Sequence, residues 1–142
     1  MTKEQKEKIM EVLRANELGA VATNSGATPE LAVVAVSQTE ELELIFATFN
    51  DTRKFQNIIK DPWVALVMGW DNEIGKNVQI EGTARLVSED EREKIEEIHL
   101  KKNPRSLAFK NDPRQSYFIV TPQWFRYSNF SGGAKEVWEI NV

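Results

Sequence analysis

Hydrophobic residues recur mostly at every second position along this 142-residue chain, a period typical of β-strands. Alternating or continuous apolar runs predict strands at residues 18–23, 31–36, 42–48, 63–68, 77–87, 117–121, 124–128 and 137–140. The run at 31–36 is almost wholly apolar, so we expect a strand covered on both faces. Pro122 lacks an amide hydrogen and divides the two segments near it, so we expect two separate strands there.

Helices are predicted from capping signals and apolar spacing at three places. A T-x-x-Q capping box at residues 2–5 opens the chain with an amphipathic helix. A short helix is expected between an N-cap at Asn50 or Asp51 and the helix breaker Pro62. A second capping box, at residues 88–91, begins a charged helix that runs to about residue 102.

Turn signals join the expected strands closely. They lie at residues 24–26, 71–75 and 131–133, whereas residues 105–114 carry no clear pattern. The first three strands leave no room for helices between them, which excludes a doubly wound parallel sheet. The sequence therefore predicts a mainly β protein: a closed or partly closed barrel of six to eight mostly antiparallel strands, with about three peripheral helices.

Composition narrows the classes of protein. A hydrophobic content of 41% and a charged content of 28% are ordinary for a globular chain, and we expect one domain over residues 1–142. The net charge of −4 argues against a general partner of nucleic acid or of membrane surfaces. The charged first residues do not form a signal peptide, and no apolar run reaches the ~18–20 residues of a membrane span. Cysteine is absent, which removes disulfides and thiolate chemistry, so a cytoplasmic protein is expected.

The common signatures of catalysis are missing from the sequence. It has no phosphate loop of the G-x-x-x-x-G-K type, no G-x-G-x-x-G and no G-x-S-x-G motif. The one histidine, His99, follows Ile98, which we expect to be buried together with Ile95 on the charged helix. A single helical histidine supplies neither a catalytic triad nor a metal site, so a structural or solvated role is expected.

Residues 50–59 place positive charge where a helix favours negative charge. The first turn exposes free N–H groups and the positive end of the helix dipole, yet it holds Thr52, Arg53 and Lys54. A bound anion would turn this unfavourable arrangement into a favourable one. We interpret the turn as a phosphate site. Two alternatives remain open: solvated basic side chains, and a turn that pairs with carboxylates across a dimer.

A second polar feature lies on the strand at 77–87. Asn77 and Gln79 share one face of that strand, as period-two geometry requires. A phosphate turn, an apolar barrel and a few amides together suit a ligand with a phosphate tail and a flat head. Flavin mononucleotide (FMN) is such a molecule, because its ring carries acceptors and one donor that amides can satisfy. A solvent-facing polar strip is the alternative for these two residues.

The order of these features resembles the pyridoxamine 5′-phosphate oxidase-like family of FMN-binding split β-barrels. The resembling pattern runs from the strand at 42–48 through Thr-Arg-Lys at 52–54 and Asn-Ile at 57–58 to Asp-Pro-Trp-Val-Ala-Leu at 61–66. It then continues after a hairpin with Asn-Val-Gln-Ile-Glu-Gly-Thr-Ala at 77–84. The resemblance covers about two-thirds of the chain well and the remainder loosely.

The resemblance implies a set of cofactor contacts. Thr52, Arg53 and Lys54 would hold the flavin phosphate, and Ala47 and Thr48 would contact the ribityl chain and the ring edge. The other implied contacts come from the backbone of the strand at 34–36 and from side chains on later strands. They are Val34, Ala35, Val36, Asn77 and Trp124, to which the pattern above adds Gln79.

The resemblance also implies a homodimer with two flavins at the subunit interface, so that Trp124 would reach the partner's cofactor. It implies redox chemistry on a small substrate, with NAD(P)H as a candidate electron donor. The alternatives are a flavin carrier or sensor without turnover, and a barrel that holds haem or a deazaflavin instead. True vitamin B6 oxidases end in an arginine- and histidine-bearing motif that residues 125–138 lack, so oxidation of pyridoxamine phosphate is not expected.

Overall fold

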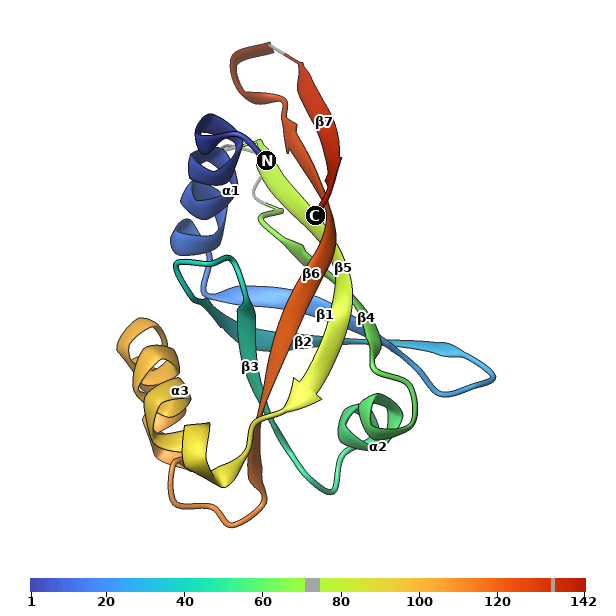
Figure 1. Cartoon of the computed structure of the whole chain (residues 1–142), viewed down its shortest axis with the longest axis vertical. Helices are drawn as coiled ribbons and strands as arrows, with labels where there is room; N and C mark the ends of the chain where they lie inside the picture. Colours follow the sequence, from blue (N-terminus) through green and yellow to red (C-terminus); the bar gives the residue numbers. More distant parts are fainter. Residues whose placement is uncertain (71–74, 134) are drawn as a thin grey trace.

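The computed structural model describes residues 1–70, 75–133 and 135–142 as a β-barrel with helices around it (Figure 1). Neighbouring strands are antiparallel, in the order β3-β2-β1-β4-β5-β6-β7, and a further β3–β6 pairing closes the first six into a barrel. The strands are β1 (Leu18–Asn24), β2 (Pro29–Gln38), β3 (Leu44–Phe49), β4 (Trp63–Met68), β5 (Lys76–Leu86), β6 (Gln115–Asn129) and β7 (Glu136–Asn141). The predicted mainly β barrel is confirmed.

Three α-helices and two short 3₁₀ segments complete the described part of the chain: α1 (Lys3–Ala15), α2 (Arg53–Lys60), α3 (Glu89–Lys102), η1 (Pro104–Phe109) and η2 (Ser131–Gly133). Both predicted capping boxes are present, at the starts of α1 and α3. Helices α1 and α2 lie toward opposite ends of the barrel, and α3 lies beside β3 (Figure 1). No helix in the described residues is long and apolar enough to cross a membrane.

The core fills the barrel with alternate side chains from its strands. Buried examples are Val21, Val34, Val36, Leu44, Phe46, Leu66, Met68, Ile80, Phe118 and Val120. Helix α1 covers one end of the barrel with its apolar stripe, in which Ile9 and Leu13 are fully buried. Burial of each large aliphatic side chain contributes on the order of 1.5–3 kcal/mol. The core therefore holds the strands in the register that sets the positions of the surface residues.

The expectation of two strands around Pro122 is wrong. Residues 115–129 form the single strand β6, because a bulge absorbs the proline. Glu81 pairs with Trp124, but Gly82 pairs with Pro122, so one β6 residue has no partner on β5. A bulge tolerates a residue that cannot donate to the ladder. Gly82 is needed opposite it, because an added Cβ would collide with the Thr121 carbonyl.

Strand β2 is not covered on both faces in this chain. Val34 and Val36 face the core, but Leu31 is 74% exposed and Val33 is 62% exposed. Within the described residues, no helix packs over the outer face of β2 at these two positions. The apolar run at 31–36 thus predicts a strand but does not tell whether both of its faces are buried within the chain.

Three smaller expectations also need comment. Strand β3 begins at Leu44 because Leu42 adopts a left-handed turn conformation, with a φ of 66°. Ile98 is only partly buried, since α3 turns His99 and Ile95 toward the barrel, four residues apart on one helix face. The hairpin loop expected at residues 71–75 lies, except for Gly75, outside the described residues.

Candidate functional site

The residues of the first half of the chain that are expected to bind the cofactor lie near the point where β2 and β3 separate. The pairing between the two strands ends at Val36 and Phe46, although β2 starts at Pro29 and β3 continues to Phe49. Beyond that point β2 remains paired with β1, while β3 remains paired with β6. This divergence is the split in the barrel. Helix α2 begins four residues after β3 ends.

Thr52 is the N-cap of α2, so the expected cap at Asn50 or Asp51 is wrong by one or two residues. The Thr52 hydroxyl accepts a hydrogen bond from the Phe55 amide (3.3 Å) and donates to the Phe49 carbonyl (2.9 Å). It also lies 2.9 Å from the hydroxyl of Thr48 at the end of β3. Two threonine hydroxyls therefore lie together at the first turn of the helix.

The two cations of this turn have different surroundings. Arg53 is exposed and forms an ion pair with Glu30 on β2. Lys54 is partly buried, and no carboxylate among the described residues lies within 4.0 Å of its ammonium. Burial lowers the pKa of Lys54, because the charged form loses hydration without gaining an opposite charge. The first turn of α2 contains no acidic residue, and helix geometry leaves the N–H groups of Arg53 and Lys54 without a partner inside the helix.

A buried polar network fixes the start of α2 on the barrel. Asn57 is 7% exposed, and its amide nitrogen donates to Thr23 of β1 (3.0 Å) and to the Glu30 carboxylate (2.8 Å). Glu30 in turn holds Arg53, one helical turn before Asn57. The sequence interpretation missed Glu30 and Thr23. The one available signal was Asn57, a polar residue in the apolar half of a short helix.

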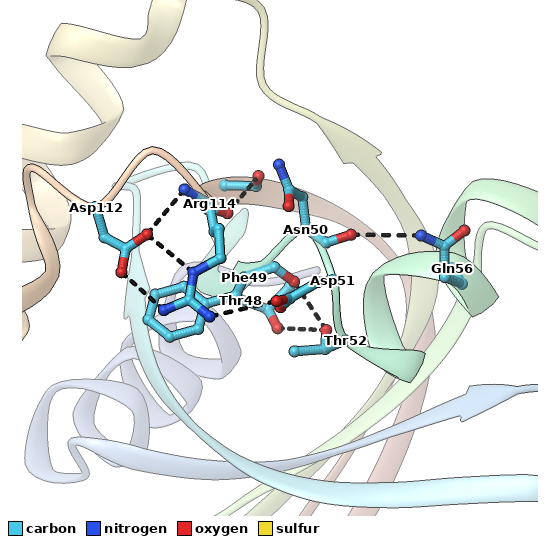
Figure 2. Close-up of polar contacts among 9 residues, drawn as sticks. Thr48, Phe49, Asn50, Asp51, Thr52, Gln56, Asp112 and Arg114 are labelled. Carbon is cyan, nitrogen blue, oxygen red and sulfur yellow. Dashed lines mark hydrogen bonds and ion pairs between the residues drawn. The ribbon is translucent and has the colours of Figure 1, made fainter.

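Arg114 holds the loop that precedes α2 (Figure 2). Its carbonyl accepts the Asn50 amide (2.8 Å), and its guanidinium bonds Asp112 (2.9 and 3.1 Å) and Asp51 (3.3 Å). The guanidinium carbon also lies 4.3 Å from the centre of the Phe49 ring. These contacts raise the pKa of Arg114 and lower the pKa of Asp112. Arg114 comes from the stretch without a clear sequence pattern, so sequence reasoning missed it.

The expected residues on β2 and β3 point in different directions. Val34 and Val36 point into the core, so only their backbone and the Ala35 side chain are available on the outer face. On β3, Ala47 packs in the cluster beneath α3, whereas Thr48 faces Thr52. The structure thus brings the Thr48 and Thr52 hydroxyls together at the start of α2, whose first turn carries Arg53 and Lys54, but it buries the Val34 and Val36 side chains.

Asn77, Gln79 and Trp124 lie elsewhere on the barrel. Asn77 and Gln79 share the outer face of β5, as period two predicted, and they alternate with the buried Val78 and Ile80. Gln79 and Trp124 line one groove of about 370 Å³, whose described lining includes no residue of α2. A second groove of about 360 Å³ adjoins it beside the exposed Trp63. Among the described residues, the grooves beside the amide strip are therefore lined by no residue of the phosphate turn.

The donors at the start of α2 fit a phosphate ester. Two hydroxyls, two cations and unpartnered helix N–H groups suit a phosphoryl group, and a partly buried ammonium without an anionic partner is the feature such a group would complete. The outer grooves are lined mainly by Trp63, Trp124, alanines and aliphatic side chains, with two amides (Asn24 and Gln79) and the Glu81 carboxylate among them. A flat, largely apolar ring can contact such a surface. These residues therefore fit FMN.

Of the two roles expected for His99, structural or solvated, the structure shows the structural one. It is 1% exposed, and its Nδ1 and Nε2 lie 2.9 Å and 3.4 Å from the hydroxyls of Ser37 and Ser106. Burial, with a smaller effect from Lys102, lowers its pKa to about 4, so the ring is neutral at pH 7. No group of three or more histidine, aspartate or glutamate side chains among the described residues could hold a metal ion.

Comparisons with known proteins agree with the fold. The chain is 32% identical over 79 residues to the pyridoxine/pyridoxamine 5′-phosphate oxidase of Gloeothece citriformis, a match that covers 56% of this chain and 36% of that protein. It thus spans about a third of the length of that relative. Among solved structures, it superposes on General Stress Protein 26 from Bacillus anthracis with a TM-score of 0.74 at 18% identity, covering 98% of this chain and 99% of the other.

A second solved structure gives a higher TM-score. It is the heme binding protein from Mycobacterium smegmatis, with a TM-score of 0.81 at 14% identity, covering 97% of this chain and 59% of the other. At such low identities both structures support the fold alone. The sequence model described as pyridoxamine 5′-phosphate oxidase matches residues 5–129, most of the chain. The chain therefore belongs to the pyridoxamine 5′-phosphate oxidase family.

Proposed function

We propose that this chain is an FMN-binding flavoprotein, one domain over residues 1–142, that acts as an oxidoreductase on a small substrate. The observation that carries the proposal is Lys54 in the first turn of α2, a partly buried cation with no anionic partner among the described residues. The same helix start carries the paired hydroxyls of Thr48 and Thr52. A phosphate ester would restore the electrostatic stabilisation that Lys54 lost on burial.

The protein's part in the chemistry would be to bind and orient the cofactor. Thr52, Arg53 and Lys54 would hold the phosphate, with Thr48 positioning the Thr52 hydroxyl. The β2 backbone at 34–36, Ala47, Asn77, Gln79 and Trp124 are proposed as contacts for the rest of FMN. When bound, FMN supplies hydride and electron transfer at its ring. Because the turn and the amide strip lie apart in one chain, the proposal includes a homodimer in which two subunits complete each site.

The substrate is proposed as an unidentified small molecule, with NAD(P)H as the candidate electron donor. The match spans 36% of the length of the pyridoxine/pyridoxamine 5′-phosphate oxidase, so the substrate of that enzyme is not assigned to this chain. The cytoplasmic location inferred from composition stays a prediction.

Titration of purified protein with FMN tests the proposal. We expect saturable quenching of flavin fluorescence and a yellow complex. Lys54→Ala should weaken FMN binding by about tenfold or more, because a charge-assisted contact to phosphate contributes about 1.5–3 kcal/mol. Riboflavin, which lacks the phosphate, should bind wild type and the variant equally.

Lys60→Ala is the matched control, since it removes an exposed lysine from the other end of the same helix. Absence of any flavin binding by wild type would refute the proposal. Equal losses of FMN and riboflavin in Lys54→Ala would refute the phosphate assignment. Flavin binding without accelerated NAD(P)H oxidation in the presence of common acceptors would favour a carrier or sensor. Binding of haem or a deazaflavin in place of FMN would reassign the cofactor.

A further inference from the structure

Arg53, one of the two cations proposed to bind phosphate, already has an anionic partner. Its guanidinium pairs with the carboxylate of Glu30, although the Arg53 side chain is 83% exposed. The Glu30 side chain is only 21% exposed, so the carboxylate is the better fixed partner of the pair. The phosphate turn therefore carries an internal negative charge at its edge.

A hydrogen bond from Asn57 holds the Glu30 carboxylate in place. Asn57 donates to it at 2.8 Å, and the same amide nitrogen donates to the Thr23 hydroxyl at 3.0 Å. Asn57 and Thr23 are 7% and 3% exposed, so this support belongs to the packed interior. The Glu30 carboxylate thus cannot move away from the start of α2 without breaking its part-buried hydrogen bond with Asn57, whereas the exposed Arg53 can leave Glu30 easily.

A phosphate and a carboxylate bind a guanidinium in the same way, through charge-assisted hydrogen bonds to oxygen. They compete for Arg53 when both are near it, and they repel each other as like charges. A ligand with two negative charges gains more from Arg53 and Lys54 together than a ligand with one, and so it can overcome this competition more readily.

We propose that Glu30 sets the affinity and specificity of the phosphate turn, by occupying Arg53 until a doubly charged phosphate monoester displaces it. This inference rests on the proposed function of the turn. Glu30 lowers the affinity for FMN and makes its binding reversible. It also disfavours ligands with a single negative charge, which gain less from the two cations.

The test compares wild type with Glu30→Gln. Glutamine keeps an oxygen that can accept the Asn57 hydrogen bond but removes the charge. We expect Glu30→Gln to bind FMN about three- to tenfold more tightly, the range expected when one partly screened charge is removed from a site. Riboflavin binding should not change. Unchanged or weaker FMN binding by a folded Glu30→Gln protein would overturn the proposal.

Glu40→Gln is the matched control, because it removes the same charge from the Arg14–Glu40 pair, which joins α1 to the turn between β2 and β3. It should leave FMN binding as in wild type. A second measurement uses inorganic phosphate alone and follows the thermal midpoint of the cofactor-free protein. Phosphate should raise the midpoint more in Glu30→Gln than in wild type, and an equal rise would count against Glu30.

The double variant Arg53→Ala/Glu30→Gln supplies an independent test. If Glu30 acts by occupying Arg53, removal of Arg53 should weaken FMN binding more in the Glu30→Gln background than in wild type. Equal losses in the two backgrounds would overturn the inference. A wild-type protein that binds no FMN would instead refute the proposed function, while the phosphate measurement would still decide the role of Glu30.

Discussion

At the scale of single residues, burial decides what His99 does. The His99 ring projects from α3 and lies between the hydroxyls of Ser37 on β2 and Ser106 on η1. It packs edge-on to Tyr117 of β6, at 5.6 Å between ring centres. The charged group that acts on it is Lys102, whose own pKa burial lowers to about 8. A second positive charge at this position would be unfavourable, so the folded protein keeps the ring neutral.

We expect this arrangement to make stability depend on pH. The pKa of His99 falls from 6.5 to about 4 on folding, so between these values the unfolded chain binds more protons than the folded one. The free energy of unfolding should therefore rise with pH from about 4 to 6.5, by at most about 3 kcal/mol from this group. Urea unfolding across this range measures it.

His99→Gln is the comparison variant, because glutamine can bond the two hydroxyls without titrating. Glu91 and Asp112, whose pKa values are lowered by Arg85 and Arg114, lose their stabilising effect at lower pH in both proteins. The difference between wild type and His99→Gln should thus isolate the histidine. Identical pH slopes for the two proteins would show that His99 is not held neutral.

At the scale of elements, local sequence signals predicted where most helices and strands lie. They did not predict which elements pack against one another. Capping boxes and alternation identified α1, α3 and β5 because those signals act within a few residues. The exposed face of β2 and the continuity of β6 depend on what packs against them, which lies far away in the chain. The sequence pattern predicts a strand break at Pro122, and this prediction fails because the bulge that accommodates the proline requires Gly82 on another strand.

The bulge requires a glycine at position 82, and this requirement can be tested. Substitution by alanine would bring a Cβ against the Thr121 carbonyl and the Pro122 backbone, neither of which can move without disturbing β6. We expect Gly82→Ala to lower the free energy of unfolding by about 1–3 kcal/mol, as overpacking commonly does. Urea unfolding measures the loss. Gln123→Ala, an exposed change at the same bulge, should stay within about 0.5 kcal/mol of wild type.

At the scale of the molecule, the sequence indicated the phosphate turn more clearly than the other parts of the candidate site. The Thr52-Arg53-Lys54 turn was visible because positive charge at a helix start, with no acidic residue beside it, is unusual in itself. Glu30 was not visible, since only the fold brings β2 beside the start of α2. In the proposed homodimer, the position of Trp124 and Gln79 relative to the turn would depend on the second subunit, which no pattern within one chain specifies.

The outer face of the barrel predicts how two subunits would meet. Leu31, Val33 and Trp63 are 74%, 62% and 51% exposed, and Ala22 and Ala65 line the grooves that contain Leu31 and Trp63. An apolar surface of this kind typically marks a protein contact. Wild type should therefore have twice the 16.3-kDa chain mass by light scattering. Leu31→Lys should give monomers, because dimer formation would bury an unpaired charge.

Leu107→Lys tests whether position matters, since Leu107 is 60% exposed but lies on η1, away from this face. It should leave the dimer intact. If two subunits complete each flavin site, Leu31→Lys should also lose FMN affinity although its phosphate turn is unchanged, and Leu107→Lys should keep it. A Leu31→Lys protein that stays dimeric would place the interface elsewhere, and a monomeric Leu31→Lys protein with full FMN affinity would show that one chain holds the cofactor alone.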